Sequence, residues 1–379
     1  MKKWQKIGLA CAVLFVIYLV AITGLIWHHY QQKHAHVRWR LDPVIEFGAG
    51  LDHHQPAVDA RGYVYLCLDN EVACLNPDGT ARWHMPYLLS YANVCHEVTA
   101  DGRLALCETL YDNSGQTPRY HGMITAISSD GRRLWQQPIE YKGDLRGNNV
   151  SNRHLYVIDE QALYAFSLVD GTLDWELAIG PTLDEMWPQV DPAGNVYFAT
   201  DQSELVMVSA AGEELWQRSI PGCADYLPAP TGQGIVYTLD SAGNLSAVAC
   251  DDGRLIWQQP LAGGARHGNK FLYLGQSHVV ANATGQACVL TATGGLTLFT
   301  PQGQQLYQYD QLNWIGAAPC LSDTGITYLQ DREAGLLAIG PDGQVRWRNS
   351  TLTSSQAQPI LAGGNLYVMH DRELFALSP

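Results

Sequence analysis

The sequence has few charged residues and no run of basic ones. Charged side chains make up 16% of its 379 residues, and 23 Lys and Arg oppose 37 Asp and Glu, which gives a net charge of −14. A chain this acidic is a poor partner for nucleic acid or for an anionic lipid surface. Its hydrophobic content of 46% excludes a disordered protein, because that much apolar material can form a large core.

Motifs of common catalytic and metal sites are also absent. None of the nine cysteines are adjacent, and there is no CxxC pair or phosphate-binding glycine motif. We find no Ser/His/Asp arrangement, no paired-carboxylate signature, and no helical periodicity after residue 36. The sequence therefore predicts an all-β protein that is not an enzyme and has no cofactor or metal.

One long uncharged stretch is present, at residues 7–27. A helix of about 20 apolar residues spans the hydrocarbon core of a bilayer, and three lysines precede this one. We expect a cytoplasmic tail at 1–6, a transmembrane helix at 7–27, a linker at 28–36, and the rest outside the cytoplasmic (inner) membrane, in the periplasm or extracellular space. The alternative, a cleaved signal peptide, has a shorter apolar region of about 7 to 15 residues.

A short pattern occurs seven times: a turn glycine, usually preceded by Asp, is followed four positions later by an aromatic residue. Successive aromatics are 40 to 52 residues apart, close to the length of one four-stranded propeller blade. The copies run from Gly79 to Trp83, Gly131 to Trp135, Gly171 to Trp175, Gly212 to Trp216, Gly253 to Trp257, Gly303 to Tyr307, and Gly343 to Trp347.

Each repeat also contains the other strands of a blade. Residues 56–65, 188–197 and 319–328 share one pattern of strand, glycine turn and alternating apolar strand. The Asp-Gly turn then leads to a last strand, whose aromatic ring we expect to pack between neighbouring blades. A β-sandwich with ordinary core aromatics is the alternative, but the regular spacing favours blades.

The two ends of the outer region complete the count of blades. Residues 359–377 supply three strands with no fourth, whereas residues 37–40, which contain Trp39, match residues 345–348 letter for letter. We predict that strand 37–40 pairs with the C-terminal three and closes a ring over residues 37–379. This gives eight blades of four antiparallel strands; seven is the alternative if that strand does not pair.

The Asp-Gly-x-x-x-Trp copies resemble the repeat of the pyrroloquinoline-quinone-type β-propellers. That superfamily includes quinoprotein dehydrogenases, which hold a quinone and Ca²⁺ in the funnel, and the non-enzymatic propeller of the outer-membrane barrel-assembly machinery. Dehydrogenases carry an adjacent cysteine pair that is missing here, and none of their catalytic or calcium-binding residues can be matched. The resemblance therefore implies a scaffold rather than a dehydrogenase.

Two cysteine pairs have positions that permit disulfides. A two-residue turn at residues 70–71 would place Cys67 opposite Cys74, and Cys95 and Cys107 are symmetric about a turn at residues 101–102. Buried free thiols are the alternative for each pair. For the remaining outer cysteines, free buried thiols are the favoured interpretation.

The innermost strands of a propeller line its channel, and polar or aromatic residues gather at these positions. A binding rim for a peptide, partner loop or small ligand is one interpretation, and a water-filled tunnel that tolerates polar groups is the other. The candidates are His53, His54, His96, Glu97, Asn148, Asn149, Trp187, Gln189, Tyr226, His267 and Trp314. The first four raise a weaker hypothesis of metal binding.

The sequence thus predicts a membrane-anchored extracytoplasmic propeller that binds a protein partner or acts as a scaffold. The alternative is a quinone-binding dehydrogenase or ligand sensor that uses the funnel. An insertion at residues 108–122 is a secondary contact candidate, because insertions on one face of a repeat ring often make contacts.

Overall fold

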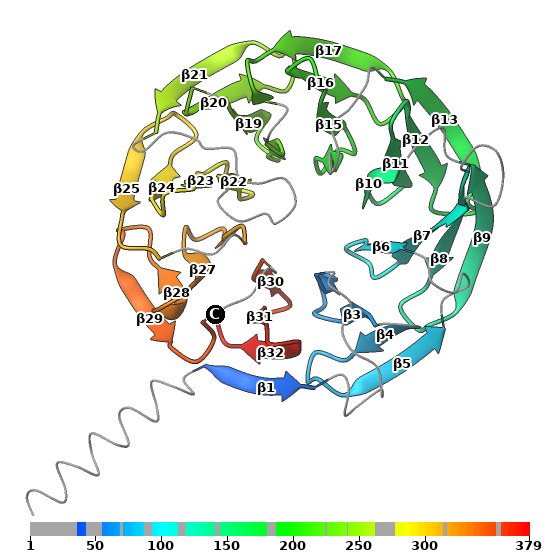
Figure 1. Cartoon of the computed structure of the whole chain (residues 1–379), viewed down its shortest axis with the longest axis horizontal. Coiled ribbons are helices and arrows are strands. Elements are labelled where there is room, and N and C mark those ends of the chain that lie inside the picture. Colours follow the sequence, from blue (N-terminus) through cyan, green and yellow to red (C-terminus); the bar gives the residue numbers. More distant parts are fainter. Residues whose placement is uncertain are drawn as a thin grey trace, which may run out of the picture.

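The computed structural model describes residues 36–42, 55–68, 71–86, 93–112, 119–140, 145–179, 187–223, 226–240, 242–261, 277–313, 317–353 and 358–379. Within these ranges, 32 strands form eight four-stranded antiparallel sheets that radiate from a central axis (Figure 1). The predicted eight-bladed propeller is confirmed. The described residues contain no helix with the length and apolar character to span a bilayer. The helix predicted at 7–27 lies outside them.

Blades are numbered along the chain, with strands ordered from the axis outward. Blades 1 to 4 consist of β2 (Ala57–Val58), β3 (Val64–Cys67), β4 (Glu71–Leu75) and β5 (Ala81–Pro86); β6 (Asn93–Val98), β7 (Leu104–Asp112), β8 (Arg119–Ile127) and β9 (Arg133–Glu140); β10 (Leu145–Val150), β11 (His154–Asp159), β12 (Ala162–Ser167) and β13 (Leu173–Ala178); β14 (Gln189–Val190), β15 (Val196–Ala199), β16 (Glu204–Val208) and β17 (Glu214–Ser219).

Blades 5 to 7 repeat this order, and blade 8 combines the two ends of the described chain. They consist of β18 (Ala229–Pro230), β19 (Ile235–Leu239), β20 (Asn244–Ala249) and β21 (Leu255–Pro260); β22 (His278–Ala281), β23 (Ala287–Leu290), β24 (Leu296–Phe299) and β25 (Gln305–Tyr309); β26 (Cys320–Leu321), β27 (Thr327–Asp331), β28 (Gly335–Ile339) and β29 (Val345–Asn349); β30 (Ile360–Ala362), β31 (Asn365–His370), β32 (Glu373–Leu377) and β1 (Val37–Leu41).

The core lies between blades. The two middle strands of a blade, such as β15 and β16 of blade 4, are buried on both faces because each blade packs between two neighbours. This explains their continuous apolar sequence, which a sheet with one wet face would not require. The outermost strands are half exposed.

The repeated glycine and the repeated aromatic meet across the joint between blades. Gly131 has φ +84°, and a Cβ added there would lie 2.8 Å from Cγ of Trp83 in the preceding blade. Positive φ and the close approach both require glycine. Equivalent contacts join Trp39 to Gly79, Trp135 to Gly171, Trp175 to Gly212, Trp216 to Gly253, Trp257 to Gly303, and Tyr307 to Gly343. The expected packing of the aromatic rings between blades is confirmed.

Hydrogen bonds reinforce these joints. The indole Nε1 of Trp83 donates to the carbonyl of Ser129 in the next blade at 3.0 Å. The same bond recurs from Trp39 to Pro77, Trp135 to Leu168, Trp175 to Ala210, Trp216 to Cys250, and Trp257 to Pro301. Nearer the axis, tyrosine hydroxyls do the same, as from Tyr65 to the Gly102 carbonyl at 3.0 Å.

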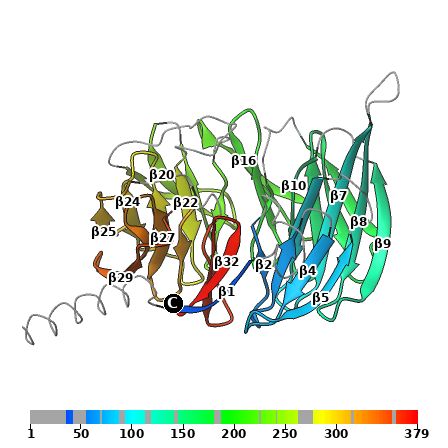
Figure 2. The same ribbon diagram turned by 60° about the horizontal axis from the view of Figure 1, so that its bottom comes forward.

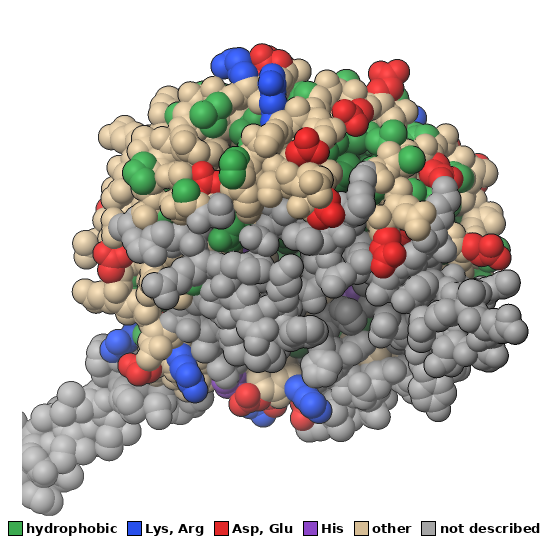
Figure 3. All heavy atoms as spheres, turned by 45° about the horizontal axis from the view of Figure 1, so that its top comes forward, with side chains coloured by type: hydrophobic (Ala, Val, Ile, Leu, Met, Phe, Trp, Pro, Cys, Tyr) green, Lys and Arg blue, Asp and Glu red, His purple; other side chains and the backbone are tan. Residues whose placement is uncertain are grey.

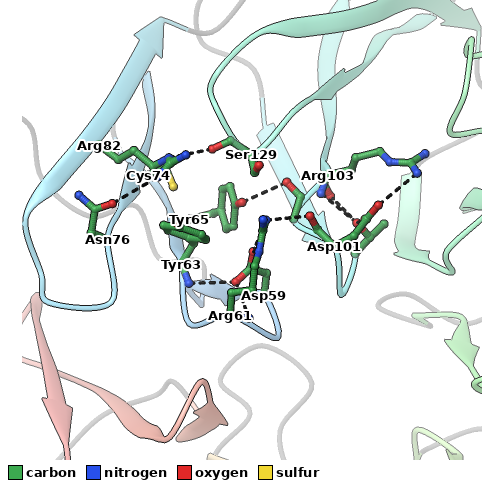
Figure 4. Close-up of polar contacts among 12 residues, drawn as sticks. Asp59, Arg61, Tyr63, Tyr65, Cys74, Asn76, Arg82, Asp101, Arg103 and Ser129 are labelled. Carbon is green, nitrogen blue, oxygen red and sulfur yellow. Dashed lines mark hydrogen bonds and ion pairs between the residues drawn. The ribbon is translucent and has the colours of Figure 1, made fainter.

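Figure 4 shows a further link between blades 1 and 2. Arg61 donates through Nη2 to Asp59 at 2.9 Å and to the Asp101 carbonyl of blade 2 at 2.8 Å. The guanidinium groups of Arg61 and Arg82 lie 5.0 and 4.5 Å from the ring centre of Tyr63, which places this ring between two cations. The bond to Asp101 stabilises the joint, and the ring contacts within blade 1 hold the Arg61 side chain beside it.

Blade 8 has the same construction as the others although its strands come from both ends of the described chain. β1 pairs antiparallel with β32, with Trp39 opposite Ala376 and Leu41 opposite Leu374. A register shift leaves one unpaired residue, Arg38, directly before the aromatic, as in the outermost strand of every other blade. At the joint with blade 7, His36 stacks on Trp347 at a centroid distance of 4.5 Å.

Blade 2 is longer than its neighbours. β7 and β8 contain nine residues each, and they project beyond the other blades at one face of the ring (Figure 2). Tyr111 pairs with Tyr120 near the end of this hairpin. Residues 108–112 and 119–122 of the predicted insertion form the paired ends of these two strands.

The expected register of the first cysteine pair is wrong. Cys67 lies opposite Val72, and Cys74 lies opposite Tyr65, because the turn comes one residue earlier than predicted. The two cysteines are therefore diagonal neighbours, at a distance of about 7 to 8 Å that a disulfide does not span. Cys95 does lie opposite Cys107, but the side chain of Cys95 is outside the described residues. Burial raises the pKa of the Cys74 and Cys288 thiols to about 12, so both are unreactive at neutral pH.

Candidate binding surface along the central channel

The innermost strands β6, β10 and β14 come from three consecutive blades and approach the axis (Figure 1). They or their immediate neighbours carry six predicted rim residues: His96, Glu97, Asn148, Asn149, Trp187 and Gln189. A seventh, Tyr226, precedes β18. His53, His54, His267 and Trp314 lie outside the described residues.

Contacts join the segment before β14 to β10. The side-chain amide of Asn149 on β10 donates to the Pro188 carbonyl at 2.9 Å. Within the segment at β14, the side-chain amide of Gln189 donates to the Trp187 carbonyl at 3.3 Å. Gly147 permits this approach, since a Cβ there would lie 3.1 Å from Cα of Trp187. These contacts fix the backbone of Trp187, whose side chain is partly exposed.

Glu97 and Asn148 face each other's blade across the joint between blades 2 and 3. Glu97 lies opposite Ala105, and Asn148 opposite Val157. Directly opposed residues in a sheet share one face. Ala105 and Val157 belong to one core cluster between these blades, and β6 and β10 are in contact. We call Glu97, Asn148, Asn149, Trp187 and Gln189 the channel arc.

The electrostatics of the channel arc are unusual. Burial raises the pKa of Glu97 to about 7, so its carboxyl is partly protonated at neutral pH. Asn148 is fully buried, and neither its side-chain oxygen nor its nitrogen has a hydrogen-bond partner. A buried unpartnered amide costs roughly 1 to 3 kcal/mol. The partly exposed members Glu97, Asn149 and Gln189 can offer both donors and acceptors, as recognition of a peptide group requires, whereas the amide of Asn148 is closed off from solvent.

Two predicted rim residues lie elsewhere. His96 is opposite Leu106, whose cluster packs toward blade 1, and its Nδ1 is 2.9 Å from Sγ of Cys67. Tyr226 is 5% exposed and belongs to a core cluster. Neither is placed to contact a ligand in the channel. The sequence alone does not separate these two from the channel arc, because it does not say which neighbouring blade a side chain faces.

The metal hypothesis gains no support from the described residues. His96 and Glu97 are consecutive in β6, so their side chains point to opposite faces and cannot reach one ion. No group of three or more His, Cys, Asp or Glu able to hold a metal occurs in the described part of the chain.

A separate groove, not predicted from sequence, lies far from the channel. It has a volume of about 430 Å³ and separates the outer strands of blades 4 and 5. Arg218, Asp240 and Leu255 are among its lining residues. Side chains of opposite charge share it, and Arg218 donates to the Asp252 carbonyl at 3.1 Å.

The sequence profile of the family described as outer membrane protein assembly factor BamB matches residues 69–226 and 120–306. The chain belongs to this family. Individual BamB sequences share about a quarter of the aligned residues with this chain. The Yersinia pestis protein is 25% identical over 269 residues, covering 65% of this chain and 67% of its own length. The Escherichia coli K12 protein is 27% identical over 281 residues, covering 68% and 70%.

Solved structures share the fold of this BamB-family chain. BamB from Moraxella catarrhalis superposes with a TM-score of 0.64 at 13% identity, covering 90% of this chain and 99% of that one. A europium-containing methanol dehydrogenase reaches 0.56 at 13% identity, covering 87% and 84%. At this identity both likenesses concern the fold alone, which enzymes and assembly factors share.

Proposed function

We propose that this chain is a non-catalytic scaffold that binds a segment of a protein partner at the channel arc. The observation that carries the proposal is the arc itself, where a carboxyl of raised pKa, two side-chain amides and a tryptophan, all partly exposed, come from adjoining blades. A peptide segment supplies N–H and C=O groups that match such a surface, and tryptophan is a frequent anchor of binding energy.

Family membership supports the same function. The relatives are named outer membrane protein assembly factors, and assembly is work done on protein partners. We extend this to an envelope location for the present chain, with residues 7–27 as a single-pass anchor in the inner membrane and residues 37–379 outside the cytoplasm. Residues 1–6 and 28–36 are the tail and linker of this arrangement.

Crosslinking from the channel arc tests the proposal. A photoreactive amino acid replaces Trp187 in the full chain, and a matched variant carries it in place of Leu215, which is 49% exposed on β17. After illumination in cells and solubilisation of the membranes, we expect one reproducible crosslinked protein from position 187 and none of that size from position 215. Equal patterns at the two positions would contradict binding at the arc.

The quinone-binding alternative has a direct test of its own. The channel residues described include one carboxylate of raised pKa, which is a weak ligand for Ca²⁺. Titration of the purified chain with pyrroloquinoline quinone and Ca²⁺ should give no saturable change in the quinone spectrum. Stoichiometric binding would favour the dehydrogenase or sensor instead.

A further inference from the structure

The residues on either side of the repeated aromatic differ between blades. In blades 7, 8 and 1, which are consecutive around the ring, five of these six positions are arginine and the sixth is histidine. They are Arg346 and Arg348 on β29, Arg38 and Arg40 on β1, and Arg82 and His84 on β5. All six are exposed. We call this set the basic rim.

The same positions in the other five blades hold no basic residue. They are Leu134 and Gln136, Asp174 and Glu176, Leu215 and Gln217, Ile256 and Gln258, and Leu306 and Gln308. Acidic residues show no such difference between blades. Asp78 and Asp342 precede the outermost strands of blades 1 and 7, and Asp170 and Asp252 precede those of blades 3 and 5. On the face visible in Figure 3, acidic side chains are scattered over the described part, while Lys and Arg lie at the upper and lower margins.

Contacts within the protein hold the basic rim without neutralising it. Arg346 pairs with Asp342 at 3.0 Å, and Arg40 lies 3.8 Å from Glu373 while its side chain stays 65% exposed. Arg82 donates to the Ser129 carbonyl at 3.0 Å. The arginines outnumber their acidic partners in a chain whose net charge is −14. Composition alone predicts a surface that avoids anionic lipid, so this local excess is unexpected.

We propose that the basic rim faces anionic lipid headgroups, so that the propeller meets the membrane with its edge at blade 8 rather than with either flat face. This rests on the proposed anchor at residues 7–27. Only the nine residues 28–36 separate that segment from β1, and nine residues span at most about 30 Å. The basic rim is centred on β1, the strand that this tether keeps near the bilayer.

A lipid surface is favoured over an acidic protein because of this tether. Attraction to anionic headgroups acts only within about one Debye length, roughly 10 Å, so it orients a body already held close to the bilayer. Each arginine near such a surface strengthens binding roughly five-fold. The tether and the rim then act on the same edge of the ring, and both openings of the channel stay accessible.

Arginine labelling on vesicles tests the orientation. The full chain is reconstituted into phosphatidylcholine vesicles with or without a quarter of phosphatidylglycerol, treated with phenylglyoxal, and read by mass spectrometry. We expect labelling of Arg40 and Arg348 to fall at least three-fold on the anionic vesicles and to recover at high salt. Arg218 and Arg254, exposed on blades 4 and 5 across the ring, should label equally on both. Equal labelling of Arg40 and Arg348 on the two kinds of vesicle would overturn the proposal and would favour an acidic protein partner as the occupant of the rim.

Paired charge variants separate this inference from the proposed anchor. The variant Arg40→Gln/Arg348→Gln should lose the difference between the two vesicles in the labelling of the remaining rim arginines Arg38 and Arg346, while the matched variant Arg218→Gln/Arg254→Gln keeps it. Flotation with pure phosphatidylcholine vesicles reports the anchor alone. If the chain does not float with them, the anchor is wrong, and salt-sensitive flotation with anionic vesicles still supports the basic rim. Failure to bind either vesicle would reject both.

Discussion

The carboxyl of Glu97 illustrates how a single side chain responds to its place between blades. Its pKa is about 7 in the folded chain, above the ordinary value of 4.5, because burial disfavours the charged form. The unfolded chain therefore releases this proton at lower pH than the folded one. The stabilising contribution is complete below pH 4.5 and is lost as the pH rises through 7.

We therefore predict that Glu97→Gln stabilises the protein at high pH only. The gain at pH 8 should be roughly 1 to 2 kcal/mol, less than the full shift implies because the side chain is partly exposed, and near zero at pH 4. Urea unfolding of both proteins across this range measures the difference. A gain that does not change with pH would show that ionisation is not its source.

The turn glycines give a second prediction at this scale. Gly131 and Gly234 both have positive φ, but a Cβ meets Trp83 at the first and nothing within 4 Å at the second. Gly234→Ala should cost about 1 kcal/mol from the backbone alone, and Gly131→Ala about 2 to 5 kcal/mol, because displacement of the ring adds to it. Thermal unfolding of the pair isolates the contribution of the tryptophan. Equal losses would mean that the ring moves freely.

Single residues also mark the limit of sequence reading. The glycine-to-aromatic repeat identified seven of the joint aromatics, and Trp39 followed from the match of residues 37–40 to residues 345–348. The sequence could not place His96 and Tyr226, since alternation along a short strand does not say which neighbour a side chain faces until the register is known. The same ambiguity, a turn shifted by one residue, misplaced Cys67 relative to Cys74.

At the scale of elements, β1 forms the same kind of joint as strands continuous with their blades. The indole of Trp39 donates to the Pro77 carbonyl at 2.9 Å, and that of Trp175 to the Ala210 carbonyl at 3.1 Å. We expect Trp39→Phe and Trp175→Phe to destabilise the protein by similar amounts, about 0.5 to 1.5 kcal/mol beyond the loss of packing. Calorimetry of both variants measures this. A much smaller cost at Trp39 would indicate a weak closing joint.

The arrangement of elements also explains why the basic rim was not foreseen. Residues 38–40 and 346–348 stand at opposite ends of the printed sequence, and an estimate of net charge averages over both. Only the order of the blades places the strands side by side. The channel arc was partly anticipated because Asn148, Asn149 and Trp187 lie on or just before the innermost strands of successive repeats, which the repeat pattern locates.

For the molecule as a whole, the pairing of β1 with β32 predicts that the ring tolerates a change of connectivity. Ser378 donates its backbone N–H to the His36 carbonyl at 2.7 Å, so a short glycine-containing turn can join these residues. A permuted chain that begins at residue 43 and carries residues 36–42 after Pro379 should melt within a few degrees of the original, in one transition. The same chain without residues 36–42 is the control and should melt far lower. Equal melting of the two would show that the closing strand contributes little.

The composite blade also has a consequence for synthesis from the ribosome. About 330 residues separate Leu41 from its partner Leu374, so β1 emerges early and waits for the last residues to arrive. At about 5 to 20 residues per second the interval is roughly 20 to 60 s. Throughout this interval β1 has no partner strand, and its side chains Trp39 and Leu41 lack the neighbours that cover them in the folded ring. A chaperone that binds aromatic and aliphatic side chains would therefore act on this segment of the nascent chain.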